Sequence, residues 1–293
     1  MTNACSLVLL PGMDGTGRLF RPLLRALGEE IRAQVVAYPP DQNSTYDDLA
    51  DLVSRSLPSD EPFVMLAESF SGPVAIKVAA SRPPYLAGLI LCASFLVSPV
   101  PKWLRFFVSA AVFRHGVSTA LLHVFVLNGG TRRAVVEEAT AVVRSVAPAV
   151  LAARLRALLQ VNVTEALRSC PAPILYIAPS KDRLVGARGL ATIRRARPDV
   201  ESVVLQGPHF LLQARPRESV DDAPVLDPGT PDLPGIENFL RCRRRQVELS
   251  APGGPRFLLE VVDEPLDALA DMPGEPSAVA VDGRSKPDPV TGF

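Results

Sequence analysis

The chain has 293 residues, of which 47% are hydrophobic, and its 31 basic side chains balance its 31 acidic ones. This length and composition allow a sizeable buried core, in one large domain or two modest ones. The balanced charge gives no indication of a nucleic-acid partner, for which a clustered basic face is expected. The four cysteines show neither CxxC nor metal-ligand spacing, so we expect no disulfide framework, no metal site and no cofactor.

The first residues lack the basic segment, apolar run and small-residue cleavage site that mark a secretory signal. The longest uncharged run, residues 115–131, contains His, Ser, Thr and Asn and is shorter than the roughly 20 apolar residues that a membrane span needs. These features predict a cytoplasmic protein without stable insertion into a membrane.

Six nearly continuous apolar runs have the composition of strands that are buried on both faces of a sheet. In chain order they cover residues 6–10, 33–38, 63–67, 86–93, 173–178 and 201–206. Helical patterns, with apolar residues three and four positions apart, lie between them, as in residues 46–57 and 185–196. The alternation predicts an α/β fold with a mostly parallel, doubly wound sheet of about six strands.

The alternation stops between residues 96 and 170, where only helical patterns occur. We therefore expect residues 1–95 and 171–242 to form the core of the fold, and residues 96–170 to form a helical cap inserted into it. Frequent proline and glycine predict a weakly structured C-terminal tail over residues 243–293.

The segment VMLAESFSGPVAIKVAA, residues 64–80, runs from an expected strand into an expected helix, with Ser69 at the junction. Function in a doubly wound sheet gathers at the carboxyl ends of its strands. Ala67, Ser71 and Gly72 are the small neighbours that a sharp strand-to-helix turn requires around an outward-pointing serine. The pattern predicts a nucleophile elbow, although a helix N-cap serine explains the same residues.

Two further residues follow strands in the same way. Asp182 comes after the expected strand at 173–178, and His209 comes after the one at 201–206. A nucleophilic serine needs a base to take its proton, and that base needs a third group to orient it. Taken singly, Asp182 can be a helix-cap or turn acid and His209 a surface histidine. Their joint placement, in the chain order Ser, Asp, His, predicts a catalytic triad.

A glycine-rich turn, LPGMDGTG, follows the first expected strand. Such a turn lets backbone N–H groups approach a substrate closely. We expect the backbone N–H groups of Met13 and Phe70 to stabilise an oxyanion. The turn lacks the lysine and the spacing of phosphate-binding loops, so a nucleotide site is not expected.

Three aromatic residues, Trp103, Phe106 and Phe107, lie close together in the expected cap, within PKWLRFFVSAAVF. They can contact an acyl chain or lipid, or they can pack over the core. We treat them as candidate substrate-binding residues.

The motifs LPGMDG, AESFSG, SKD and GPH resemble those of the α/β-hydrolase superfamily of serine hydrolases, over roughly residues 6–242. The resemblance implies that Ser69 is the nucleophile, His209 the general base and Asp182 its orienting acid. The implied reaction cleaves a carboxylic ester or thioester of a small-molecule acyl substrate through an acyl-enzyme. The same triad supports acyl transfer or cleavage of a short peptide. The proline-rich residues after His209 depart from the family pattern and leave a catalytically degenerate binding protein as a further alternative.

Overall fold

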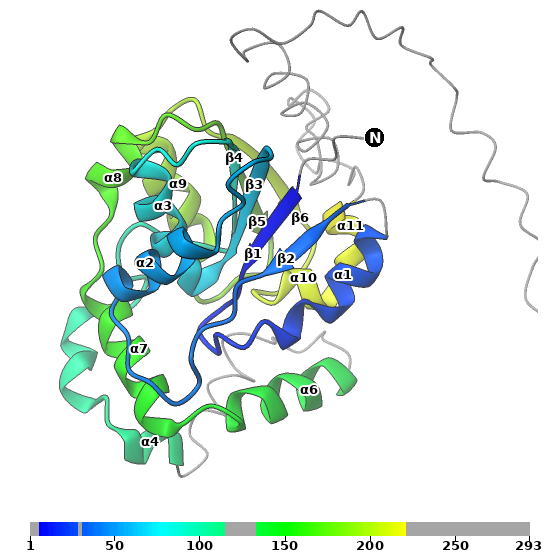
Figure 1. Ribbon diagram of the computed structural model, residues 1–293. Coiled ribbons are helices and arrows are strands. Elements are labelled where there is room, and N and C mark those ends of the chain that lie inside the picture. The colour runs from blue at the N-terminus through cyan, green and yellow to red at the C-terminus, as the bar shows by residue number, and fades with distance from the viewer. Residues whose placement is uncertain (1–5, 29–30, 115–132, 221–293) are drawn as a thin grey trace, which may run out of the picture. The chain divides into compact units, whose positions relative to one another are not determined.

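A computed structural model describes residues 6–28, 31–114 and 133–220 of the chain (Figure 1). Six strands form one sheet in the order β2-β1-β3-β4-β5-β6, and every neighbouring pair is parallel. The strands are β1 (Ser6–Leu10), β2 (Ala33–Val35), β3 (Phe63–Glu68), β4 (Leu86–Cys92), β5 (Ile174–Pro179) and β6 (Glu201–Leu205). The predicted six-stranded parallel sheet is confirmed, with β2 shorter than the apolar run that contains it.

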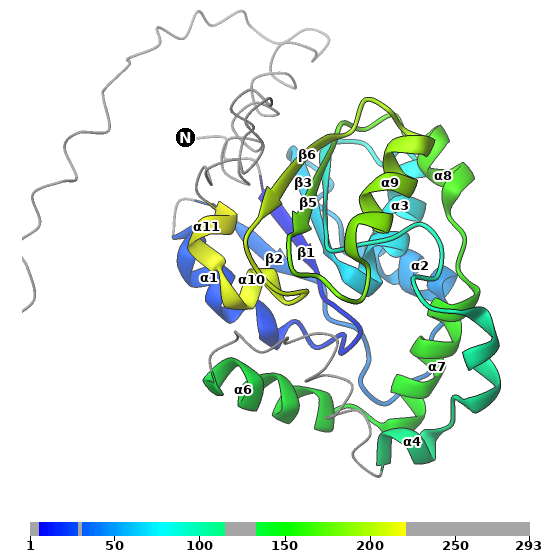
Figure 2. The same cartoon turned by 180° about the vertical axis from the view of Figure 1, so that it is seen from behind.

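Helices cover both faces of the sheet (Figures 1 and 2). One face carries α1 (Arg21–Leu27), α10 (Leu211–Ala214) and α11 (Pro216–Val220), and the other carries α2 (Tyr46–Ser56), α3 (Gly72–Ala80), α8 (Thr164–Ser169) and α9 (Gly186–Ala196). Successive strand residues point to opposite faces, so Met65 joins the apolar cluster of the second face and Leu66 that of the first. Burial on both faces explains why the strands read as continuous apolar runs.

Helix α2 shows how local sequence sets an element of this fold. Thr45 caps the helix by accepting a hydrogen bond from the backbone N–H of Asp48, whose carboxylate accepts from the backbone of Thr45 in return. Leu49 and Val53 form its buried face, so the cap and the apolar spacing together position Tyr46 in the first turn. Tyr46 reaches the site described below.

A helical insertion separates β4 from β5, as predicted. It contains η3 (Lys102–Phe107), α4 (Ala110–Arg114), α6 (Arg133–Arg144), α7 (Pro148–Gln160) and α8. Ala139 and Val142 of α6 pack on Leu19 of the short helix η1 (Arg18–Phe20), which follows β1 closely. By contrast, Leu167 of α8 belongs to the main apolar cluster beside the sheet. The division into a core and a separate cap at residues 96–170 stays a prediction.

Other sequence-based expectations concern the ends and the surface. The predicted tail, residues 243–293, and the proline-rich stretch at 224–234 lie outside the described residues. Among the described residues, no helix is long and apolar enough to cross a membrane.

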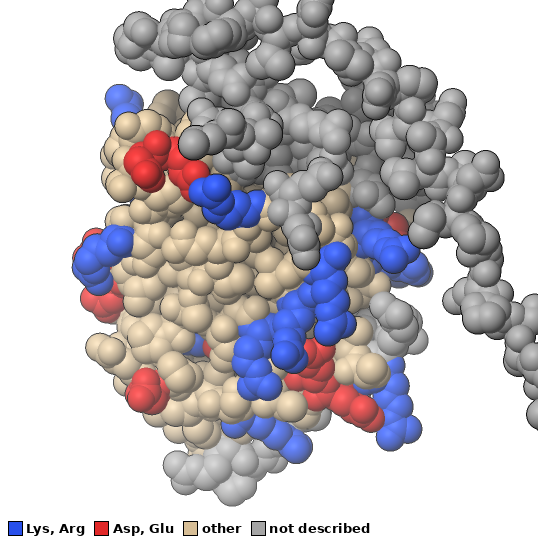
Figure 3. Space-filling view, turned by 45° about the vertical axis from the view of Figure 1, so that its right-hand side comes forward, with Lys and Arg blue, Asp and Glu red and all other residues tan. Residues whose placement is uncertain are grey.

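On the face in Figure 3, basic side chains lie beside acidic ones and a broad uncharged area. This face therefore presents charges of both signs.

Candidate active site

Ser69 occupies a strained turn between strand β3 and helix α3. It opens the short helix η2 (Ser69–Ser71) and has a φ of 49°. A non-glycine residue at positive φ is uncommon and persists only where the surrounding structure enforces it. Gly72, where helix α3 begins, has no room for a side chain, because a Cβ atom there would lie 1.6 Å from Oγ of Ser94. The turn therefore has the geometry that the sequence predicts for a nucleophile elbow.

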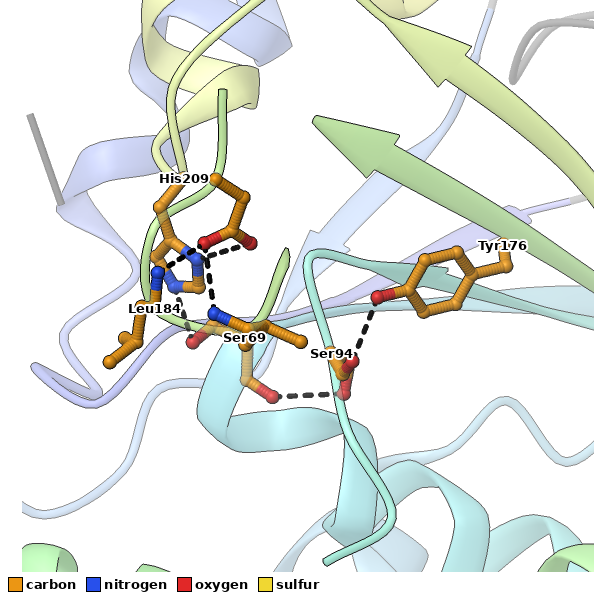
Figure 4. A network of polar contacts seen from close by, with 7 residues as sticks. Ser69, Ser94, Tyr176, Leu184 and His209 are labelled. Atoms are coloured by element: carbon orange, nitrogen blue, oxygen red, sulfur yellow. Dashed lines mark hydrogen bonds and ion pairs between the residues drawn. The ribbon is translucent and has the colours of Figure 1, made fainter. Parts of the chain in front are cut away.

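Polar contacts from distant elements hold this turn. Oγ of Ser94 donates to the carbonyl of Ser69 over 3.0 Å, and the Tyr176 hydroxyl donates to the carbonyl of Ser94 over 2.8 Å (Figure 4). On the other side, Oγ of Ser71 donates to the carbonyl of Pro11, which follows β1. These bonds join the elbow to β5, to the residues after β4 and to the loop after β1.

His209 connects Ser69 with Asp182. Its Nε2 atom lies 2.8 Å from Oγ of Ser69, and its Nδ1 atom lies 2.8 Å from Oδ2 of Asp182 (Figure 4). With the proton on Nδ1, the imidazole donates to the carboxylate and accepts from the serine hydroxyl. The side chains of His209 and Asp182 are each only 2% exposed. The structure thus brings the three sequence-predicted residues together in the order that nucleophilic catalysis requires.

The carboxylate of Asp182 has partners for both of its oxygens. Oδ1 accepts hydrogen bonds from the backbone N–H groups of Leu184 at 2.8 Å and Val185 at 3.0 Å, while Oδ2 faces His209. Burial acts to raise the pKa of Asp182, but the hydrogen bond and charge of His209 and the two backbone donors outweigh it and lower that pKa. Asp182 is therefore ionised at neutral pH and can stabilise a protonated imidazole.

The loop after β1, residues 11–17, is shaped by its own polar contacts. Oδ1 of Asp14 accepts from both the backbone N–H and the hydroxyl of Thr16, at 2.9 and 2.6 Å. Gly15 and Gly17 adopt φ angles of 72° and 70°, which are accessible to glycine without strain. The backbone N–H of Gly15 donates to the carbonyl of Gly12 over 3.0 Å. We refer to residues 11–17 as the β1 loop.

The expected oxyanion donors lie in two structured segments. Met13 belongs to the β1 loop, and Phe70 lies in the first turn of η2, where backbone N–H groups have no carbonyl partner within the helix. The ring of Phe70 stacks on that of Tyr46 at 4.9 Å, and the Tyr46 hydroxyl donates to the carbonyl of Phe70 over 3.2 Å. The role of the Met13 and Phe70 N–H groups as oxyanion donors stays a prediction.

A second buried polar pair adjoins Ser69. Glu68, which precedes the serine, is 2% exposed, and its Oε2 accepts a hydrogen bond from Nε2 of Gln213 over 3.1 Å. Oε1 of each side chain has no hydrogen-bond partner among the described residues. Burial, assisted by the charge of Asp14, raises the pKa of Glu68 to about 7 against the opposing effects of Gln213 and His209.

The aromatic residues of the insertion are exposed. Trp103, Phe106 and Phe107 of η3 have 59%, 74% and 68% of their surfaces exposed, and the rings of Trp103 and Phe107 meet edge to face at 6.0 Å. They do not pack over the core, and a contact with substrate stays a prediction.

Sequence patterns missed the residues that support the site. Ser94, Tyr176 and Gln213 each reach it from a separate element, so no local spacing connects them with Ser69. Glu68 carried a usable signal, since it is an acidic residue at the end of a strand that is otherwise apolar. Within the described part of the chain, no group of three or more His, Cys, Asp or Glu side chains is arranged to hold a metal ion.

Comparisons with known proteins agree with this fold. An esterase from Thermogutta terrifontis is 20% identical, with a TM-score of 0.63 over 74% of this chain and 86% of that one. A lipase-esterase related protein from Clostridium acetobutylicum is 15% identical, with a TM-score of 0.61 over 74% and 91%. A membrane phospholipase A described as a bacterial virulence factor is 18% identical, with a TM-score of 0.61 over 74% and 76%.

At this identity the solved structures establish the fold alone. No curated protein sequence matches the chain significantly. The family model described as "Alpha/beta hydrolase family" matches residues 7–223, which include the strained serine, the acid and the histidine. The chain therefore belongs to the alpha/beta hydrolase family.

Proposed function

We propose that the protein is a serine hydrolase that cleaves a carboxylic ester or thioester through an acyl-enzyme intermediate. The observation that carries the proposal is the continuous path of hydrogen bonds from Ser69 through His209 to Asp182, with both links at 2.8 Å. A serine hydroxyl is a weak nucleophile unless an oriented base removes its proton, and this arrangement supplies that base.

The proposed reaction has two stages. Oγ of Ser69 attacks the carbonyl carbon of the substrate while Nε2 of His209 takes the hydroxyl proton, and the ionised Asp182 stabilises the resulting imidazolium. The N–H groups of Met13 and Phe70 bind the oxyanion of the tetrahedral intermediate. His209 then returns the proton to the departing alcohol or thiol, which leaves the acyl group on Ser69. Water, activated by His209, releases the carboxylic acid in the second stage.

The structural relatives support an acyl substrate, because the three compared above are an esterase, a lipase-esterase related protein and a phospholipase A. The exposure of Trp103, Phe106 and Phe107 supports an apolar acyl chain, since aromatic side chains on the insertion are available to contact it. We therefore propose these three residues as acyl-chain contacts.

Burst kinetics with a p-nitrophenyl ester and an aryl thioester test the proposed function. Rapid formation of an acyl-enzyme should release one chromophoric leaving group per active site before steady turnover begins. Ser69→Ala should remove both the burst and the turnover. If wild-type protein turns over neither substrate and gives no acylated serine by mass spectrometry, the hydrolase proposal is wrong and the binding-protein alternative gains support.

A further inference from the structure

Arg154 of helix α7 is a fully buried charged side chain, with 0% of its surface exposed. A buried guanidinium is costly unless its donors are satisfied. Here its two Nη atoms bond to backbone carbonyls of two loops rather than to a carboxylate, while Nε has no hydrogen-bond partner among the described residues. Nη1 donates to the carbonyls of Met13 at 3.0 Å and Asp14 at 2.7 Å, and Nη2 donates to that of Pro39 at 2.9 Å. The insertion therefore reaches into the β1 loop through one side chain.

The bonds from Arg154 fix the two peptide groups that follow the expected oxyanion donor, the Met13 N–H. A trans peptide is planar, so holding a carbonyl also sets the direction of the N–H in the same peptide. The carbonyl of Gly12, in the peptide that carries the Met13 N–H, accepts from Gly15. Arg154 holds the carbonyls of the next two peptides, at Met13 and Asp14. Three consecutive peptides of the β1 loop are thus oriented, two of them by Arg154.

The β1 loop is built to admit this guanidinium. A Cβ atom on Gly15 would lie 2.5 Å from Nη1 of Arg154, so the guanidinium occupies the space that a side chain at residue 15 would need. Cζ of Arg154 lies over the ring of Tyr38, 5.7 Å from its centroid, which is a cation–π distance. The Tyr38 hydroxyl lies 2.6 Å from Oγ of Ser71, in the turn that carries Ser69. Arg154, the β1 loop and the elbow therefore form one connected polar network.

We propose that Arg154 is a positioning residue that sets the oxyanion-binding geometry of the β1 loop, so that the insertion controls transition-state stabilisation from outside the triad. This inference rests on the proposed function. Arg154 itself contacts neither the triad nor the expected path of the substrate in the described contacts. Its effect acts through the backbone of Met13. Arg154 should therefore stabilise the transition state more than it strengthens substrate binding.

The test compares Arg154→Met and Arg154→Lys with a matched control, Arg156→Met. Arg156 lies two residues further along α7 and also donates to a backbone carbonyl, that of Val108, but it is exposed. Lysine keeps the charge while losing the planar fork that reaches three carbonyls, so Arg154→Lys should retain the fold and be impaired less than Arg154→Met. Rates are normalised to active sites counted by burst titration, so that unfolded protein does not contribute.

For Arg154→Met we expect kcat per titrated site for a p-nitrophenyl ester to fall about 10- to 100-fold, which is a smaller decrease than removal of a whole oxyanion donor causes. KM should change less than about threefold. Affinity for a trifluoromethyl ketone, which forms a tetrahedral oxyanion on the serine, should fall by a similar factor. Binding of the product carboxylate and the activity of Arg156→Met should stay near wild type.

Two results would overturn the inference while leaving the hydrolase proposal standing. One is that kcat per titrated site and affinity for the ketone are unchanged, both in Arg154→Lys and in the folded fraction of Arg154→Met. Arg154 would then be purely structural. The other is a loss confined to KM, which would place it in substrate binding. If wild-type protein shows no burst and no turnover, the proposed function itself fails, and this outcome is distinct from both.

Discussion

At the scale of single residues, the ring of His209 is held at both of its nitrogen atoms. Asp182 determines which nitrogen carries the proton, because its carboxylate accepts from Nδ1 and leaves Nε2 free to accept the proton of Ser69. The carboxylate in turn is fixed by two backbone donors from the segment that leads into α9. The groups that orient the histidine here all lie within the described residues.

Replacing Asp182 with asparagine should leave the fold intact and lower kcat by about 10⁴, because an amide can donate to Nδ1 and so favour the wrong tautomer. Steady-state kinetics at pH 7 measure this effect. Arg183→Gln, at the neighbouring position, is the control and should keep kcat near wild type. A loss of less than tenfold in Asp182→Asn would show that the carboxylate does not orient His209.

Glu68 gives a prediction about pH. Its pKa is raised from 4.5 to about 7, mainly by burial. At a pH between these two values, Glu68 therefore keeps its proton in the folded protein but has lost it in the unfolded chain. The free energy of unfolding should therefore fall as pH rises from about 4.5 to about 7, by about 3 kcal/mol from this group, and level off above that range.

Glu68→Gln removes this contribution while keeping a similar shape. Urea unfolding of both proteins between about pH 4.5 and about pH 8 should show the variant gaining stability relative to wild type as pH rises. Glu61→Gln, at a half-buried position near the start of β3, serves as the control. Parallel pH profiles for wild type and Glu68→Gln would mean that folding does not raise the pKa of Glu68.

At the scale of elements, the short helix η3 carries the predicted acyl contacts. Phe106→Ala should change the preference between short and long acyl chains by about 1–3 kcal/mol in relative kcat/KM, which is the effect of one or two methylene groups in an apolar contact. The fold should survive, because the side chain is 74% exposed. Measuring kcat/KM across a series of p-nitrophenyl esters gives the profile.

Tyr85→Ala is the matched control, since Tyr85 is also an exposed aromatic residue but lies just before β4, at the amino end of that strand. Its chain-length profile should equal that of wild type. Unchanged profiles for Trp103→Ala, Phe106→Ala and Phe107→Ala together would remove η3 from the acyl path.

The helices after His209 show where prediction from sequence reaches its limit at this scale. The sequence shows proline-rich residues after His209 that depart from the family pattern, and its apolar patterns predict no helix for residues 210–220. The structure has two short helices there, α10 and α11, with Leu211, Leu212 and Val220 buried against the sheet. Pro216 stands at the start of α11, where a proline is tolerated because the first N–H of a helix needs no partner.

At the scale of the whole molecule, the sheet and the proximity of Ser69, Asp182 and His209 could be predicted from sequence, because each depends on local pattern. Continuous apolar runs mark strands buried on both faces, and residues just after parallel strands meet at one edge of the sheet. Ser69, Asp182 and His209 all follow strands in this way.

The supporting network could not be predicted from the sequence, because its bonds join segments that are far apart in the chain. Arg154, like Glu68, carries a local signal. It lies four positions after Val150 and four before Leu158, both buried, so helical spacing places it on the apolar face of α7. Spacing predicts that such an arginine is buried, but its partners in the β1 loop depend on how the insertion packs.

We propose above all that Ser69 is an activated nucleophile. Labelling with a fluorophosphonate probe, followed by peptide mass spectrometry, tests it most directly. We expect one label per folded molecule, on Ser69, with no label on Ser69→Ala and a loss of kcat in that variant on the order of 10⁴ to 10⁶. Labelling of Ser71 in its place, or full ester turnover by Ser69→Ala, would contradict the assignment.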